Sequence, residues 1–147
     1  SLHMLRREIG DSAFFRGLRS YYMKYRHGNA LTQDLQHELE VSSGTTLDWF
    51  FEQWFERPGY ADLGVSWRYD QARRTVMVTV SQGDKRPPYR LTLPIEITTA
   101  TGKVVRSKVV VPATRVGTIP VPATLDGAPK IVRFDPDVSL LATITSR

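Results

Sequence analysis

The sequence predicts an α+β chain in two parts, a short all-helical segment over residues 1–60 and an antiparallel, immunoglobulin-like β-sandwich over residues 61–147. Apolar residues recur at helical spacing before residue 58, and after it they alternate or form short β-branched runs. Turn signals separate about seven short candidate strands, which is typical of a sandwich. The 147 residues, of which 41% are hydrophobic, suit one or two small folded domains.

The first two predicted helices lie on either side of Gly10. Residues 2–9 place Leu2, Leu5 and Ile9 on one face, and Gly10 is a good C-cap. This helix has no N-terminal cap, so we expect it to be the end of a longer one. Asp11 is the expected cap of the second helix, which ends near residues 28–29. The expected apolar stripe of the second helix comprises Phe14, Phe15, Leu18, Tyr21, Tyr22 and Tyr25.

Two more helices are predicted before the sandwich. Thr32 is the expected cap of the third helix, which stops before Gly44. Thr45 and Asp48 have capping-box spacing for the fourth helix, which Pro58-Gly59 ends. We expect the apolar face of the fourth helix to lie in the core rather than in a partner groove. That face comprises Leu47, Phe50, Phe51, Trp54 and Phe55.

From residue 61 onward the pattern is that of β-strands. Turn signals such as Gly83-Asp84 and Asp135-Pro136-Asp137 separate the candidate strands. Pro94 inside the third strand predicts an edge position or a bulge, because proline cannot donate a ladder hydrogen bond. The candidate strands cover residues 63–69, 75–81, 89–98, 103–111, 116–121, 129–134 and 140–144.

The net charge of +5 is unevenly distributed. Residues 1–30 carry six Lys/Arg against two Asp/Glu (+4), residues 31–60 one against six (−5), and residues 61–147 thirteen against seven (+6). Arg73-Arg74 and Lys85-Arg86 lie beside turns, so we expect solvated strand ends and no nucleic-acid partner. The chain has neither a signal peptide nor a run of 18 apolar residues, so we expect no membrane span and a cytoplasmic location.

The sequence offers no set of metal ligands or catalytic groups. His37-Glu38 begins like the zinc-helix signature H-E-x-x-H, but Val41 stands where the second histidine belongs. His3 and His27 have no further ligand at metal spacing, and the chain has no cysteine. We therefore predict no metal site, no cofactor site and no catalytic residue in this chain.

The serines and the acidic turn are also assigned structural roles. None of the serines at positions 42, 43, 107 and 139 lies in a G-x-S-x-G context. Asp135 and Asp137 are too few oxygen ligands for Ca²⁺, so we expect side-chain caps of a turn.

Several strings resemble the aminopeptidase N family of zinc metallopeptidases, the gluzincin aminopeptidases. In the helical part they are Leu2-His3-Met4-Leu5, Tyr25-Arg26-His27-Gly28-Asn29 and Trp49-Phe50-Phe51 with Gln53-Trp54. In the sandwich they are Leu93-Pro94-Ile95 and Phe134-Asp135-Pro136-Asp137. The resemblance implies that residues 1–60 are the end of a catalytic domain and that residues 61–147 are the β-sandwich domain after it.

The resemblance also implies that the chemistry lies upstream of this chain. The zinc ligands, the general base and the catalytic tyrosine of the family match no position here, and none of the tyrosines at positions 21, 22, 25 and 60 takes that role. We therefore expect a non-catalytic, structural portion of a zinc aminopeptidase that acts on peptides. The alternative is a scaffold or protein-interaction module from a catalytically dead relative. The expected partners are the missing upstream catalytic domain and a second copy bound through the helical segment.

Overall fold

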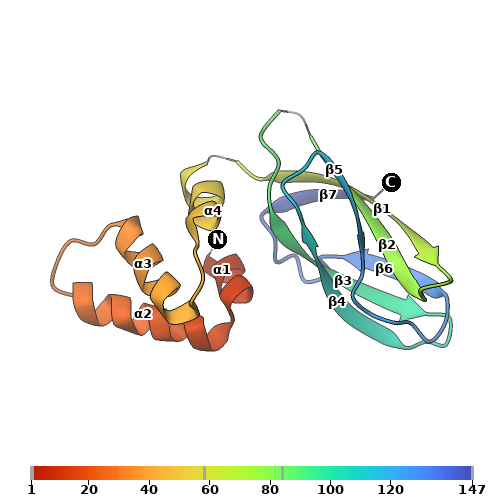
Figure 1. The fold of residues 1–147 in the computed structure, drawn as a ribbon, viewed down its shortest axis with the longest axis horizontal. Coiled ribbons are helices and arrows are strands. Elements are labelled where there is room, and N and C mark those ends of the chain that lie inside the picture. Colours follow the sequence, from red (N-terminus) through yellow and green to blue (C-terminus); the bar gives the residue numbers. More distant parts are fainter. Residues whose placement is uncertain (1, 58, 84, 147) are drawn as a thin grey trace. The chain divides into compact units, whose positions relative to one another are not determined.

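The computed structural model describes residues 2–57, 59–83 and 85–146. Two expected turn residues, Pro58 and Asp84, lie outside these ranges. The chain divides into two compact units, Ser1–Gly59 and Tyr60–Arg147. The first contains the helices and the second the strands, so the expected helical segment followed by a β-sandwich is confirmed (Figure 1).

The helical unit is built from five short elements. They are α1 (Leu2–Ile9), α2 (Asp11–Tyr25), α3 (Thr32–Ser43), α4 (Asp48–Phe51) and a π-helical turn, η1 (Glu52–Glu56). The two longest, α2 and α3, pack side by side along much of their length (Figure 1).

The corner between α1 and α2 differs from the predicted cap. Asp11 is the first residue of α2 rather than its cap, and Gly10 before it has a φ of 86°, which favours glycine. The Asp11 carboxylate instead accepts two hydrogen bonds from the Arg6 guanidinium, at 2.8 and 3.0 Å. This bidentate hydrogen bond holds the pKa of the Asp11 carboxyl below its usual value. The corner is thus fixed by an ion pair.

The starts of α3 and α4 also differ from prediction, because carboxylates take the place of the threonine caps. Thr32 is the first residue of α3, and the Asp34 carboxylate accepts a hydrogen bond from the Leu31 N–H at 2.8 Å. Leu47, not Thr45, precedes α4, and its N–H donates to the Glu40 carboxylate at 2.7 Å. Glu40 therefore ties the start of α4 to α3.

The contact between α2 and α3 depends on Gly17. A Cβ atom placed there would lie 2.7 Å from Leu39 Cδ2 and 2.8 Å from Ser42 Oγ. Both neighbours are fixed, since Leu39 is fully buried and the Ser42 hydroxyl donates to the Ala13 carbonyl at 2.7 Å. The two helices therefore approach as closely as they do only because residue 17 has no side chain.

The buried faces of α1 and α2 only partly match the predicted stripes. In α1, Leu5 is buried as expected, but Leu2 is exposed and Met4 takes its place. In α2, Phe14 is buried as expected, together with small residues that the stripe did not include. The expected stripe residues that are exposed instead are Phe15 and Tyr22. Because the close contact uses Gly17, the bulky residues of α2 lie on its other side.

The predicted face of the fourth helix is largely correct. Phe50, Phe51 and Trp54 are buried, whereas Phe55 is 38% exposed and Gln53 is buried. The chain changes to a π-helical turn at Glu52, and each residue of this wider turn rotates less than in an α-helix. The change of period moves Phe55 away from the buried side.

The second unit is a two-sheet sandwich. One sheet has the strand order β5-β2-β1-β7 and the other β4-β3-β6. The strands are β1 (Ala61–Asp70), β2 (Thr75–Gln82), β3 (Leu91–Thr99), β4 (Val104–Val111), β5 (Val116–Pro120), β6 (Pro129–Phe134) and β7 (Ala142–Ser146). All pairs are antiparallel except β1 with β7, which is parallel, so the purely antiparallel expectation is wrong at this edge. The chain leaves β6 in one sheet and enters β7 in the other, beside β1 and in the same direction.

The predicted position of Pro94 is wrong, because β3 is the central strand of its sheet. The Pro94 carbonyl accepts the Asp135 N–H at 2.8 Å, just beyond the last β3–β6 pair, Ile95 with Phe134. In an antiparallel strand the N–H and the carbonyl of one residue face the same neighbouring strand. The position of the N–H that Pro94 lacks therefore faces the end of β6, beyond the last ladder pair, and no ladder hydrogen bond is lost. The irregularity in pairing lies instead between Thr98 and Thr99.

We predict that Gly17→Ala destabilises the helical unit by about 1–3 kcal/mol, because the methyl group overpacks a contact that cannot yield. Gly28→Ala is the matched control, since a Cβ there would meet no atom within 4 Å. Urea unfolding followed by circular dichroism measures both changes. Equal urea midpoints for the two variants would show that α2 and α3 can move apart with no loss of stability.

We predict that the Arg6–Asp11 pair stabilises the helical unit at neutral pH and loses its effect in acid. The folded-state pKa of Asp11 is lowered, so its contribution is present above the pKa of the unfolded chain, about 4. It is lost as the pH falls through the lower folded-state value. The melting temperatures of wild type and Asp11→Asn should therefore differ at pH 7 and converge in acid. A difference that does not change with pH contradicts this account.

Candidate functional site

The three histidines lie on separate segments, all exposed. His3 is in α1, His27 follows α2, and His37 is on α3. In the part of the chain that the structure describes, no group of three or more His, Cys, Asp or Glu side chains could hold a metal ion. A zinc site needs three or four such ligands together, so the described residues do not fit one.

The residue next to His37 has a different environment. Glu38 is only 2% exposed, and its carboxylate accepts hydrogen bonds from Lys24 Nζ at 2.5 and 3.2 Å. These hydrogen bonds raise the pKa of Lys24. The glutamate of this partial H-E-x-x-H signature therefore forms an ion pair between α3 and α2.

The acidic turn after β6 is a structural cap, as its residue types suggested. The buried Asp135 carboxylate accepts hydrogen bonds from the N–H and hydroxyl of Ser139, at 2.8 and 2.7 Å, and from the Leu140 N–H at 3.0 Å. Asp137 is exposed and lies 3.9 Å from Arg106. The two strings that suggested the sandwich resemblance meet here, since Asp135 also binds the Pro94 carbonyl.

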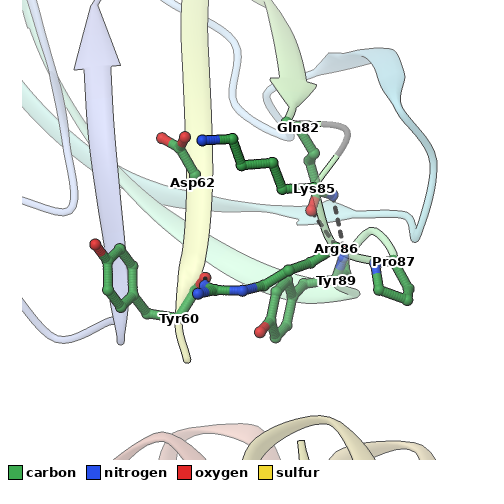
Figure 2. Close-up of a pocket in the computed structure, with 8 residues that line it drawn as sticks. Tyr60, Asp62, Gln82, Lys85, Arg86, Pro87 and Tyr89 are labelled. Carbon is green, nitrogen blue, oxygen red and sulfur yellow. Dashed lines mark hydrogen bonds between the residues drawn. The ribbon is translucent and has the colours of Figure 1, made fainter. Parts of the chain in front are cut away.

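A hollow of ≈ 320 Å³ opens at one end of the sandwich (Figure 2). It is bordered by the start of β1, the end of β2 and the segment before β3. The Lys85 side chain extends towards Asp62 there. The Arg86 guanidinium lies over the Tyr60 ring, 5.4 Å from its centroid, and donates a hydrogen bond to the Tyr60 carbonyl at 2.9 Å. The lining residues are Tyr60, Asp62, Gln82, Gly83, Lys85, Arg86, Pro87 and Tyr89.

Buried side chains fix the wall of this hollow. The Gln82 amide donates to the Tyr89 carbonyl at 2.8 Å and accepts the Tyr89 N–H at 2.7 Å, so it joins the two ends of the β2–β3 loop. Arg115 donates to the carbonyls of Gly83 and, at 2.7 Å, of Arg86. Sequence reasoning missed Gln82, although it continues the inward alternation of Val76, Val78 and Val80.

The hollow carries charged groups of both signs. Its charged groups are the cations Lys85 and Arg86 and the carboxylate of Asp62, which accepts a hydrogen bond from Thr143 at 3.0 Å. Its lining residues include no histidine, cysteine or serine.

The comparisons with known proteins agree on one family. Residues 1–54 match the family model described as the Peptidase family M1 domain. Over 59 residues the chain is 42% identical to an aminopeptidase N of Lactococcus lactis subsp. lactis, which covers 40% of this chain and 7% of that protein. It is 31% identical over 83 residues to a puromycin-sensitive aminopeptidase of Caenorhabditis elegans, which covers 54% of this chain and 9% of that protein.

A solved structure extends the likeness of the fold to nearly the whole chain. Legionella pneumophila aminopeptidase A, crystallised in complex with aspartic acid, matches 99% of this chain with a TM-score of 0.82. The identity is 15%, so this match shows the fold, and it covers 17% of that protein. The findings together confirm the resemblance recognised from the sequence, since residues 1–54 match the Peptidase family M1 domain and the similar proteins are aminopeptidases. The matched stretches cover less than a tenth of the length of these two curated relatives.

We predict that Gln82→Ala destabilises the sandwich by about 1–3 kcal/mol, because it leaves two buried backbone groups of Tyr89 without their partner. Gln71→Ala, in the exposed turn after β1, is the matched control and should have little effect. Thermal unfolding measures the stability, and hydrogen exchange at Tyr89 reports the loop directly. An unchanged rate of hydrogen exchange at Tyr89 in Gln82→Ala would show that the two Gln82 hydrogen bonds are not needed to hold the loop.

Proposed function

We propose that this chain is a non-catalytic portion of a zinc-dependent aminopeptidase, a longer protein that removes N-terminal residues from peptides. The observation that carries the proposal is the match of residues 1–54 to the Peptidase family M1 domain. The names of the relatives support the same activity for the longer protein.

The role proposed for this segment is structural. Its sequence contains three histidines, none of them spaced as H-E-x-x-H, and the described residues do not form a metal-ligand group. The zinc of the longer protein would therefore be held by residues outside this chain. The helical unit would pack against the rest of the peptidase domain, and the sandwich would follow it as a separately folded unit.

No helix among the described residues is long and apolar enough to cross a membrane. The cytoplasmic location and the absence of a nucleic-acid partner rest on the sequence alone.

We predict that the purified chain neither hydrolyses aminoacyl p-nitroanilides nor retains zinc after dialysis, because it lacks a ligand cluster. Elemental analysis and a colorimetric assay measure the two properties. Zinc bound one to one together with hydrolysis would overturn the structural role.

The same assays on the longer protein separate the proposed enzyme from a scaffold. A zinc aminopeptidase should lose hydrolysis on chelation and regain it with added zinc. A longer protein without zinc and without hydrolysis would support the scaffold alternative.

A further inference from the structure

The second apolar face of α2 is exposed in this chain. Phe15, Leu18, Arg19, Tyr22 and Met23 follow one another at i, i+3, i+4, i+7 and i+8, so they share one side of the helix. They line a hollow of ≈ 470 Å³. Phe15 is 43% exposed, Tyr22 64% and Met23 65%. We call this set of five residues the α2 stripe.

The α2 stripe lies apart from the contact with α3. That contact uses Gly17 and Ala13, both of which are buried. A helix with apolar residues on more than one side is typical of the interior of a domain rather than of its surface. Contiguous exposed apolar side chains mark a surface that another body covers.

The charges at the α2 stripe describe what would cover it. Arg6 lies over the Phe15 ring, 5.0 Å from its centroid, and is already paired with Asp11. Arg19 lies within the stripe and forms no hydrogen bond or ion pair with any other described residue. A complementary surface is therefore apolar, with a carboxylate placed opposite Arg19.

We propose that the α2 stripe is the docking surface for the rest of the peptidase domain, which presents an apolar face with an acidic side chain at Arg19. This inference rests on the proposed function, because the occupant is part of the same longer protein. Two findings favour this occupant over a second copy. The family match covers α1 to α4, so the helical unit belongs inside a domain, and the curated relatives are more than ten times longer than the segment they share with this chain.

The test uses the absence of cysteine from this chain. Met23→Cys and Tyr22→Cys are made in the chain and in the longer protein, and maleimide labelling of the corresponding peptide is followed by mass spectrometry. We expect labelling to be roughly ten-fold or more slower in the longer protein, because burial hides the thiol. Val138→Cys is the control, since Val138 is 84% exposed and lies in the sandwich unit. Its labelling rate should be the same in both proteins.

Three outcomes would overturn the proposal or support it. Protection of both stripe positions only in the longer protein supports it. Equal, fast labelling in both proteins overturns it. Protection in the isolated chain that grows with concentration identifies a second copy as the occupant, as the sequence led us to expect, and also overturns the proposed occupant.

A charge reversal tests the predicted carboxylate. Arg19→Glu should lower the melting temperature of the longer protein and leave that of the isolated chain unchanged, whereas Arg26→Glu, just after α2, should change neither. No difference between the two variants in the longer protein would contradict an acidic partner at Arg19. Zinc content and hydrolysis are measured on the same preparations. A protected stripe in a protein without zinc or hydrolysis would refute the proposed function alone, and a reactive stripe in an active zinc enzyme would refute this inference alone.

Discussion

Close contact between α2 and α3 at Gly17 determines how the rest of the helical unit is arranged. Because the helices touch there, Ser42 reaches the Ala13 carbonyl and Lys24 reaches the buried Glu38 carboxylate. The same placement of α3 lets Glu40 accept the N–H of Leu47, which fixes the start of α4. The polar contacts between α2 and α3 are therefore consequences of one position without a side chain.

The sandwich is held together differently. Its core is made of β-branched and leucine side chains that alternate along β1, β2 and β3, and its loops are fixed by polar side chains at the strand ends. Gln82 joins the two ends of one loop, and Asp135 caps another. On the outer face of β3, Glu96 lies between Arg106 and Arg133 of the neighbouring strands, at 3.1 and 3.5 Å. The contacts of Gln82 and Asp135 are local to their loops, whereas Glu96 joins three neighbouring strands.

The sequence predicted the elements well and their contacts poorly, for a physical reason. Periodicity is local, so the helices and strands could be placed from it, and Asp135 could be recognised as a cap within its own turn. Whether a cap is used or a glycine touches a neighbour depends on long-range packing. The threonine caps failed because carboxylates such as Glu40 took their place, and the buried Glu38 could not be foreseen without its partner Lys24 on another helix.

The aromatic residues of α2 show the same limit of prediction from local periodicity. Their placement also bears on the function of this helix. The sequence grouped Phe14, Phe15 and Tyr22 into one stripe, as if a single face would be buried. The structure divides them, with Phe14 against the helical unit and the other two exposed. A sequence adapted to two packing surfaces shows more apolar residues than one face can hold.

This division also separates the two constraints on the proposed longer protein. Zinc ligation requires a few ligands at fixed spacing, and their loss would abolish hydrolysis without removing a packing surface. The α2 stripe requires apolar area, which an active enzyme and a catalytically dead scaffold both need in order to fold. An intact stripe is therefore compatible with either reading of the longer protein, and only the residues that bind zinc can distinguish the enzyme from the scaffold.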